Sequence, residues 1–121
     1  MDDSKEIADL LATLVSENPG AAGCLIVGLD GVIIQSNLPD EYNIDYLGAG
    51  GASLTALAGS LLNHSVGGDL ESLQLGGTQG QLLAILIADD IALIIVAQRS
   101  MDAELAVELA TNAAPMLAQY L

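Results

Sequence analysis

Residues Tyr46–Gly68 read YLGAGGASLTALAGSLLNHSVGG, a run without a charged residue in a chain whose formal net charge is −14. Because an α-helix turns about 100° per residue, one side of such a helix collects most of the large apolar residues, and we predict that this side faces the core. Its members are Ile44, Leu47, Gly51, Leu54, Leu57, Ala58, Leu61 and Leu62. The opposite side collects small residues, namely Ala49, Ala52, Ala56, Gly59, Ser60 and Asn63, together with Asp45.

Small residues on the outer side of a helix let a second backbone approach closely. We therefore predict a helix that is packed on both sides, with an ordinary solvent-exposed helix as the alternative. The run is long enough to span a membrane, but its glycines, hydroxyls, Asn63 and His64 argue against insertion. The glycine-rich start at Gly48–Ser53 lacks the Gly-Lys-Ser/Thr of a phosphate loop, so helix packing is preferred to phosphate binding.

The composition predicts one domain over residues 1–121 with more apolar surface than a core of that size needs. Hydrophobic residues make up 52% and charged residues 15% of the chain, whereas typical soluble domains have about 45–50% and about 25%. We expect a partner protein to cover part of that excess.

The charge balance excludes several classes of function. Two basic residues stand against sixteen acidic ones, so the phosphates of a nucleic acid would be repelled. The N-terminal MDDSKE lacks the basic-then-apolar order of a secretory signal, and a single cysteine, Cys24, fits a reducing compartment. We expect a cytoplasmic protein that binds no nucleic acid and does not insert into a membrane.

The chain before the central helix predicts a helix and a hairpin. The helix covers Ser4–Ser16, and Asp3 or Ser4 can cap it, since Asp3 and Glu6 have the spacing of a capping box. Two strands, at residues 23–29 and 32–37, flank Asp30-Gly31, a pair typical of the two-residue type I′ turn.

The chain after the central helix predicts three strands and a last helix. Residues 69–75 form a weak edge strand, whereas the apolar segments 81–88 and 91–98 form central strands. Ser100 can cap the last helix, and Pro115 is expected to kink or split it. The predicted inner stripe of that helix is Met101, Leu105, Leu109, Ala113, Met116 and Tyr120.

This order of elements resembles the roadblock dynein light-chain family, which includes MglB-like regulators of small GTPases. The likeness rests on GCLIVGLDGVIIQSN (residues 23–37), on the helix rich in Gly, Ala and Ser, and on LLAILIADDIALIIVA (residues 82–97). The resemblance implies an α/β fold of the α+β sandwich type. Its five-stranded antiparallel sheet would carry the first and last helices on one face and the central helix on the other.

The family resemblance also implies a homodimer, because two protomers of that family join through the third strand and the central helix. It implies a non-catalytic regulator or scaffold that binds a small Ras-like GTPase and needs no cofactor. A subunit of a hetero-oligomeric roadblock or longin-type assembly is an alternative. Mapped onto this chain, the expected dimer interface is Ala49, Ala52, Ala56, Gly59, Ser60, Asn63, Asp69, Glu71 and Leu73.

The residues that could carry chemistry give weak signals. Cys24 and His64 are the only thiol and the only imidazole, and a small-molecule sensor or minor hydrolase using them is a further alternative, although a nucleophile needs a nearby base. The acidic pair Asp89-Asp90 is interpreted as solvated turn carboxylates, not as metal ligands. For Arg99, pairing with Asp102 or a nearby carboxylate is preferred to an arginine finger.

Overall fold

The computed structural model describes residues 3–121, so Met1 and Asp2 of the acidic N-terminus lie outside the described residues. Helices and strands follow one another in the predicted order. They are α1 (Ser4–Glu17), β1 (Ala21–Gly28), β2 (Ile33–Ser36), α2 (Ile44–Asn63), β3 (Ser72–Gly76), β4 (Gln81–Ala88), β5 (Ile91–Ala97) and α3 (Ala103–Ala118).

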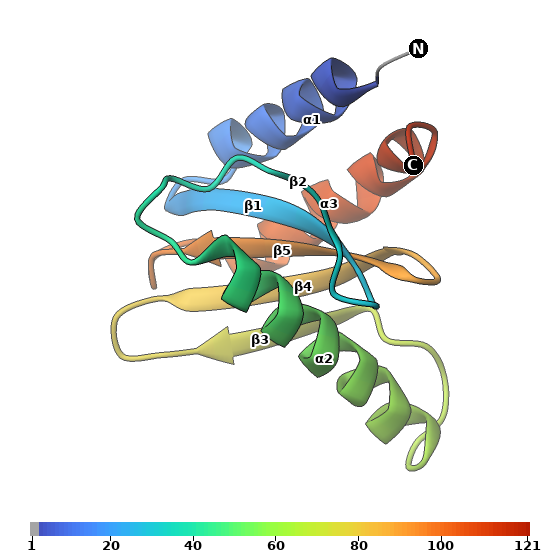
Figure 1. The fold of residues 1–121 in the computed structure, drawn as a ribbon. Coiled ribbons are helices and arrows are strands. Elements are labelled where there is room, and N and C mark those ends of the chain that lie inside the picture. Colours follow the sequence, from blue (N-terminus) through green and yellow to red (C-terminus); the bar gives the residue numbers. More distant parts are fainter. Residues whose placement is uncertain (1–2) are drawn as a thin grey trace.

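The five strands form one antiparallel sheet in the order β2-β1-β5-β4-β3. Helices α1 and α3 cover one face of the sheet, and α2 crosses the other face (Figure 1). The predicted α+β sandwich is confirmed. The structure also confirms that β3 is an edge strand and that β4 and β5 lie inside the sheet.

The sheet separates two cores, because successive side chains of a strand point to opposite faces. On β1, Cys24 and Ile26 are buried beneath α1 and α3, whereas Leu25 and Val27 are buried on the side of α2. The other inner strands alternate in the same way, which explains why their sequences are apolar without interruption.

The β1–β2 turn differs from the predicted type I′ turn. The amide of Gly31 donates to the carbonyl of Gly28 (2.9 Å), and the amide of Gly28 donates to the carbonyl of Val32 (2.9 Å). Gly31 has φ of 88°, but Asp30 does not have a positive φ, whereas type I′ requires one at both positions. The connection is therefore a three-residue loop with glycine in the left-handed position.

The caps of α1 and α3 also differ from the sequence prediction, whereas α2 begins where it was expected, after Asn43. Asn43 accepts a hydrogen bond from the amide of Tyr46 (3.1 Å) at the start of α2. Asp102, not Ser100, caps α3 by accepting from the amide of Leu105 (3.2 Å). The side chain of Asp3 makes no capping hydrogen bond, so the capping box is wrong. Helix α3 runs through Pro115 to Ala118 without splitting.

The rotation of α2 about its axis is the main correction. Gly48, Ala52 and Thr55 are the buried residues of this helix, and Ala52, predicted to face outward, is only 1% exposed. Three of the leucines predicted to face the core are exposed instead, whereas Ile44 and Leu47 pack against the core as predicted. The exposed fractions are 40% for Leu54, 56% for Leu57 and 62% for Leu61.

Crowding by isoleucines of the sheet explains this rotation. A Cβ at Gly48 would lie 2.8 Å from Cγ1 of Ile33, and one at Gly51 would lie 3.0 Å from Cδ1 of Ile94. Real Cβ atoms essentially never approach below 3.0 Å. Only a helix side made of small residues can therefore lie this close to the sheet, and Leu54, Leu57 and Leu61 are left on the outside.

The same error affects α3, whose buried residues are Ala106, Ala110, Ala113 and Leu117. The predicted Leu105, Leu109 and Tyr120 are half-buried at the flanks, and Met116 is 46% exposed. Met101 and Ala113 of the predicted stripe are buried as expected. In both helices the sheet-facing side consists mainly of small residues.

Gly48→Ala tests the close approach of α2, with Gly50→Ala as the matched control. No atom lies within 4 Å of a Cβ built at Gly50, so that variant should gain the helix propensity of alanine, about 0.5–1 kcal/mol. Overpacking costs typically about 1–3 kcal/mol, so Gly48→Ala should lower the free energy of unfolding by about 1 kcal/mol. Urea unfolding measures the free energy of unfolding of both variants. Equal midpoints for Gly48→Ala and Gly50→Ala would contradict the close packing of α2.

Candidate interaction surface

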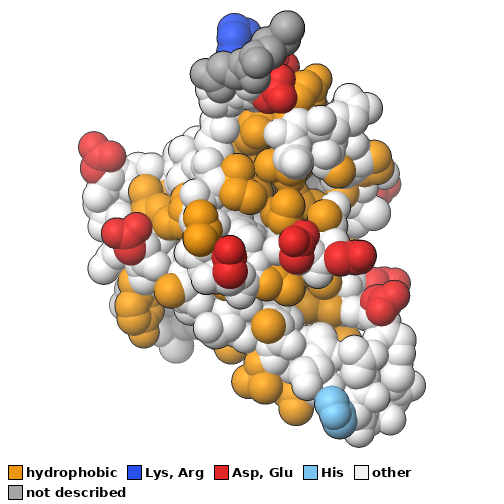
Figure 2. All heavy atoms as spheres, turned by 45° about the vertical axis from the view of Figure 1, so that its right-hand side comes forward, with side chains coloured by type: hydrophobic (Ala, Val, Ile, Leu, Met, Phe, Trp, Pro, Cys, Tyr) orange, Lys and Arg blue, Asp and Glu red, His pale blue; other side chains and the backbone are white. Residues whose placement is uncertain are grey.

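Three exposed leucines of α2 form a continuous apolar strip, which we call the leucine ridge (Leu54, Leu57 and Leu61). Their spacing of three and four residues places them on one side of the helix. Every other residue between Tyr46 and Gly68 is uncharged as well. Figure 2 shows exposed hydrophobic side chains at the lower end of the molecule, beside the histidine that follows α2. An exposed apolar surface of this kind is typical of a contact with another protein.

The leucine ridge continues onto the open edge of the sheet. Leu75 of β3 is 40% exposed, and Leu73 of the same strand packs against the core beneath α2. A narrow groove of about 20 Å³ between α2 and this edge is lined by Gly51, Leu54, Leu73 and Leu75, among others. Ligand pockets measure about 300–1,000 Å³, so the groove suits a side chain of another protein better than a small molecule.

The residues predicted for the dimer interface lie in different environments. Ala49, Ala56, Ser60 and Asn63 are exposed on α2, and Gly59 is half-buried. Asp69 and Glu71 are exposed before β3, and Leu73 is half-buried. Ala52 is buried against the sheet and cannot meet a second chain.

The sequence prediction missed the residues of α2 that are most available to a partner, because it placed the leucine ridge in the core. A signal was present in the small residues Gly48, Ala52 and Thr55, which recur at helical spacing just as the leucines do. Two possible core-facing sides were therefore encoded. The side that faces the sheet is decided by the size of the sheet's own side chains, such as Ile33 and Ile94.

Cys24 and His64 lie on opposite sides of the sheet. Cys24 is fully buried beneath α1 and α3, where burial raises the pKa of its thiol to about 12. His64 is exposed at the C-terminal end of α2, and its Nδ1 lies 2.8 Å from the carbonyl oxygen of Ser60. The imidazole therefore cannot activate the thiol, which argues against a hydrolase built on this pair.

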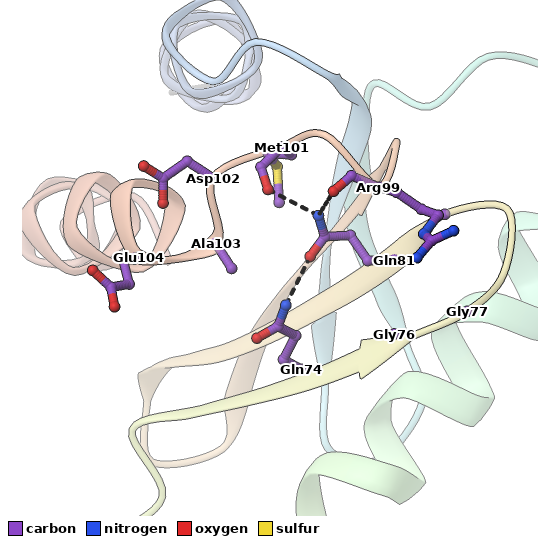
Figure 3. Close-up of a pocket in the computed structure, with 10 residues that line it drawn as sticks. Gln74, Gly76, Gly77, Gln81, Arg99, Met101, Asp102, Ala103 and Glu104 are labelled. Atoms are coloured by element: carbon purple, nitrogen blue, oxygen red, sulfur yellow. Dashed lines mark hydrogen bonds between the residues drawn. The ribbon is translucent and has the colours of Figure 1, made fainter.

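An open cleft of about 590 Å³ lies between the β3–β4 turn and the start of α3 (Figure 3). Gln81 is the buried polar group beside it. Its Nε2 donates to the carbonyls of Gln98 and Met101, both at 3.0 Å, and its Oε1 accepts from Nε2 of Gln74 at 2.9 Å. These bonds hold the loop that leads into α3, so the amide has a structural role.

The charged candidates do not form a site among residues 3–121. No group of three or more His, Cys, Asp or Glu side chains there is arranged to hold a metal ion. Arg99 donates to the carbonyl of Thr78 (3.4 Å), and the ion pair found in this part of the chain joins Lys5 and Asp9 (3.0 Å). The expected pairing of Arg99 with a carboxylate is therefore wrong. None of the described helices is both long and apolar enough to cross a bilayer.

Comparison with known proteins identifies the domain type. The family model for the Roadblock/LC7 domain matches residues 7–97. No curated protein matches the chain.

Solved structures share the fold at low sequence identity. A Roadblock/LC7 domain from Streptomyces avermitilis superposes with a TM-score of 0.84 at 20% identity, covering 92% of this chain and 93% of that one. MglB of Myxococcus xanthus superposes with a TM-score of 0.79 at 15% identity, and the match covers 94% of this chain and 95% of MglB. An MglB with a tetrameric arrangement superposes with a TM-score of 0.85 at 17% identity, and the match covers 96% of this chain and 88% of that one.

The burial of Cys24 predicts an unreactive thiol. With a pKa of about 12, the group stays protonated at pH 8, and only the thiolate attacks alkylating reagents. We expect iodoacetamide to leave the folded protein unmodified at pH 8 and to label it fully once guanidinium has unfolded it, as read by mass spectrometry. Labelling of the folded chain at the rate of the unfolded one would contradict this burial.

Proposed function

The chain belongs to the Roadblock/LC7 domain family, and from that membership we propose that it is a non-catalytic, homodimeric regulator or scaffold that binds a small Ras-like GTPase. The observation that carries the proposal is the uncharged leucine ridge beside the open edge of β3. A surface of this kind in a roadblock domain suits a second copy of the same chain.

In the proposed dimer a two-fold axis brings ridge against ridge and pairs β3 with its mate. Such an isologous contact is self-complementary, because the same patch serves both subunits. Full burial of a leucine side chain contributes about 1.5–3 kcal/mol. Since Leu54, Leu57 and Leu61 are already partly buried in the protomer, covering them contributes roughly 1 kcal/mol each.

The proposed interface keeps most residues of the sequence prediction and adds the leucine ridge. The exposed Ala49, Ala56 and Ser60 continue the outer face of α2 beside the ridge. The remaining members are Leu75 and the predicted Gly59, Asn63, Asp69, Glu71 and Leu73, whereas the buried Ala52 is removed.

The GTPase part of the proposal rests on the family and on charge. Three of the structurally similar proteins are MglB, and members of the family commonly act as platforms for small GTPases. A net charge of −14 favours a partner with a basic patch and speeds their encounter at low salt. A cytoplasmic location, expected from the sequence, remains part of the proposal.

A hetero-oligomer is the second candidate, because the same ridge could receive a related roadblock chain. The MglB with a tetrameric arrangement shows that assembly beyond a dimer occurs for that protein. The two candidates differ in what happens when a related chain is added: a homodimer persists, whereas a hetero-oligomer subunit that is dimeric only by default exchanges its mate for the related chain.

Leu57→Asp should break the proposed dimer. Light scattering at micromolar concentration should report about twice the 12.3 kDa chain mass for the wild type and a lower mass for the variant. Truncating a central interface residue costs about 2 kcal/mol or more, which raises the dimer dissociation constant at least about tenfold.

Met116→Asp is the matched control, because Met116 is a large, 46% exposed residue of α3 on the other face of the sheet. It should leave the mass unchanged. A monomeric wild type, or a Leu57→Asp variant as dimeric as the wild type, would show that the ridge does not join two copies.

The small Ras-like GTPases of the source organism, purified and loaded with GDP or a non-hydrolysable GTP analogue, test the second half of the proposal. We expect one of them to bind the immobilised chain in one nucleotide state more tightly than in the other, by about tenfold or more, which corresponds to a coupling of about 1.4 kcal/mol. Measuring GTP hydrolysis with and without the chain separates a regulator from an anchor. If none binds in either state, the GTPase assignment fails.

A further inference from the structure

The second edge of the sheet, formed by β2, is open and uncharged. β2 pairs only with β1, so its outer side has no strand partner among the described residues. Natural edge strands are commonly protected by charged side chains, especially lysine, but Ile33–Ser36 reads IIQS. The strand is short and its pairing with β1 contains a bulge. Short length and a bulge, not charge, therefore limit unwanted pairing here.

An apolar patch lies at the start of this strand. Val32 is 61% exposed and Ile34 is 41% exposed. Together with Leu29 and Ile91 they line a hollow of about 300 Å³ at the end of the sheet where the β1–β2 and β4–β5 turns meet. The amide of Leu29 donates to the carbonyl of Asp90 (2.8 Å) and joins the two turns. The hollow therefore has a fixed, partly apolar wall.

Carboxylates lie on the rim of the hollow. Asp30 and Asp90 line it, and the exposed Asp89 precedes Asp90 in the same turn. In Figure 2, where these turns come forward, carboxylates lie across the middle of the molecule and the basic side chain in view is confined to the top. Lys5 is paired with Asp9, and Arg99 contacts the β3–β4 turn at the opposite end of β5. Neither cation neutralises this rim.

We propose that this hollow and the open edge of β2 bind a cationic strand of a partner protein, in which lysine or arginine alternates with apolar residues. The strand adds to the sheet beside β2, and its backbone supplies hydrogen bonds to that edge. The methylenes of its basic side chains lie on Val32 and Ile34 while their charged ends reach the carboxylates. This surface does not depend on the proposed homodimer.

Charge argues against a second copy at this edge. A second copy would add its own Asp30, Asp89 and Asp90 to this acidic surface and would supply no cation, because Lys5 is paired with Asp9 and Arg99 lies at the opposite end of β5. The leucine ridge at the other edge of the sheet is itself uncharged, and the carboxylates of that edge, Asp69 and Glu71, precede β3. The two edges therefore suit different occupants: an identical chain at β3 and a basic partner at β2.

A fluorescein-labelled peptide of about six alternating valine and lysine residues, the length of a typical strand, tests the proposal by fluorescence anisotropy. We expect saturable binding that weakens as salt rises. Val32→Ser combined with Ile34→Ser should weaken binding about tenfold or more, and so should Asp89→Asn combined with Asp90→Asn. Peptide-induced shifts in the amide NMR signals should concentrate on Ile33–Ser36.

Matched controls separate this surface from general attraction to an acidic protein. Val66→Ser removes another exposed apolar side chain, and Glu17→Gln combined with Glu108→Gln removes the same two charges from exposed positions elsewhere. Both should bind the peptide like the wild type. The proposal is overturned if the controls weaken binding equally, or if the amide shifts concentrate on β3.

The mass of the Val32→Ser, Ile34→Ser variant by light scattering distinguishes this proposal from homodimer formation. We expect it to equal that of the wild type. If the variant dissociates instead, β2 is a contact between copies and the basic-partner assignment is wrong. Loss of dimerisation in Leu57→Asp with unchanged peptide binding would support two independent surfaces.

Discussion

The close approach of α2 to the sheet is the constraint on which the rest of the surface depends. Gly48 and Gly51 leave room for the side chains of Ile33 and Ile94, and this fit fixes which side of the helix faces inward. The leucine ridge is exposed because the opposite arrangement would drive bulky side chains into strands that are already crowded. An apolar surface for a partner is thus a consequence of how the protomer packs.

Charge then distinguishes the two edges of the sheet. Beside β3 the leucine ridge is uncharged, although Asp69 and Glu71 precede the strand, so hydrophobic burial of the ridge can join two identical, strongly acidic chains there. Beside β2 the exposed Val32 and Ile34 are next to turn carboxylates, which repel another copy and attract a cation. In the two proposed interactions, the position of the carboxylates therefore separates the basic partner from the second copy.

The groups that could have carried chemistry serve the fold. Cys24 fills the core beneath α1 and α3, where burial raises its pKa. The side-chain amide of Gln81 donates hydrogen bonds to carbonyls of the loop before α3, and His64 is the C-cap residue of α2. The family match and the surfaces both point to recognition of other proteins, which requires exposed apolar area and directed charge but no nucleophile.

The sequence by itself determined the order of elements, the strand boundaries within a few residues and the edge position of β3, because strand patterns and turn residues act locally. It also determined that one stretch, Tyr46–Gly68, is rich in apolar residues and carries no charged side chain. Only the tertiary structure decided which side of α2 and α3 faces the sheet, since leucines and small residues both recur at helical spacing. For α2 that choice depends on the volume left by Ile33 and Ile94, side chains distant in sequence, and no local pattern records it.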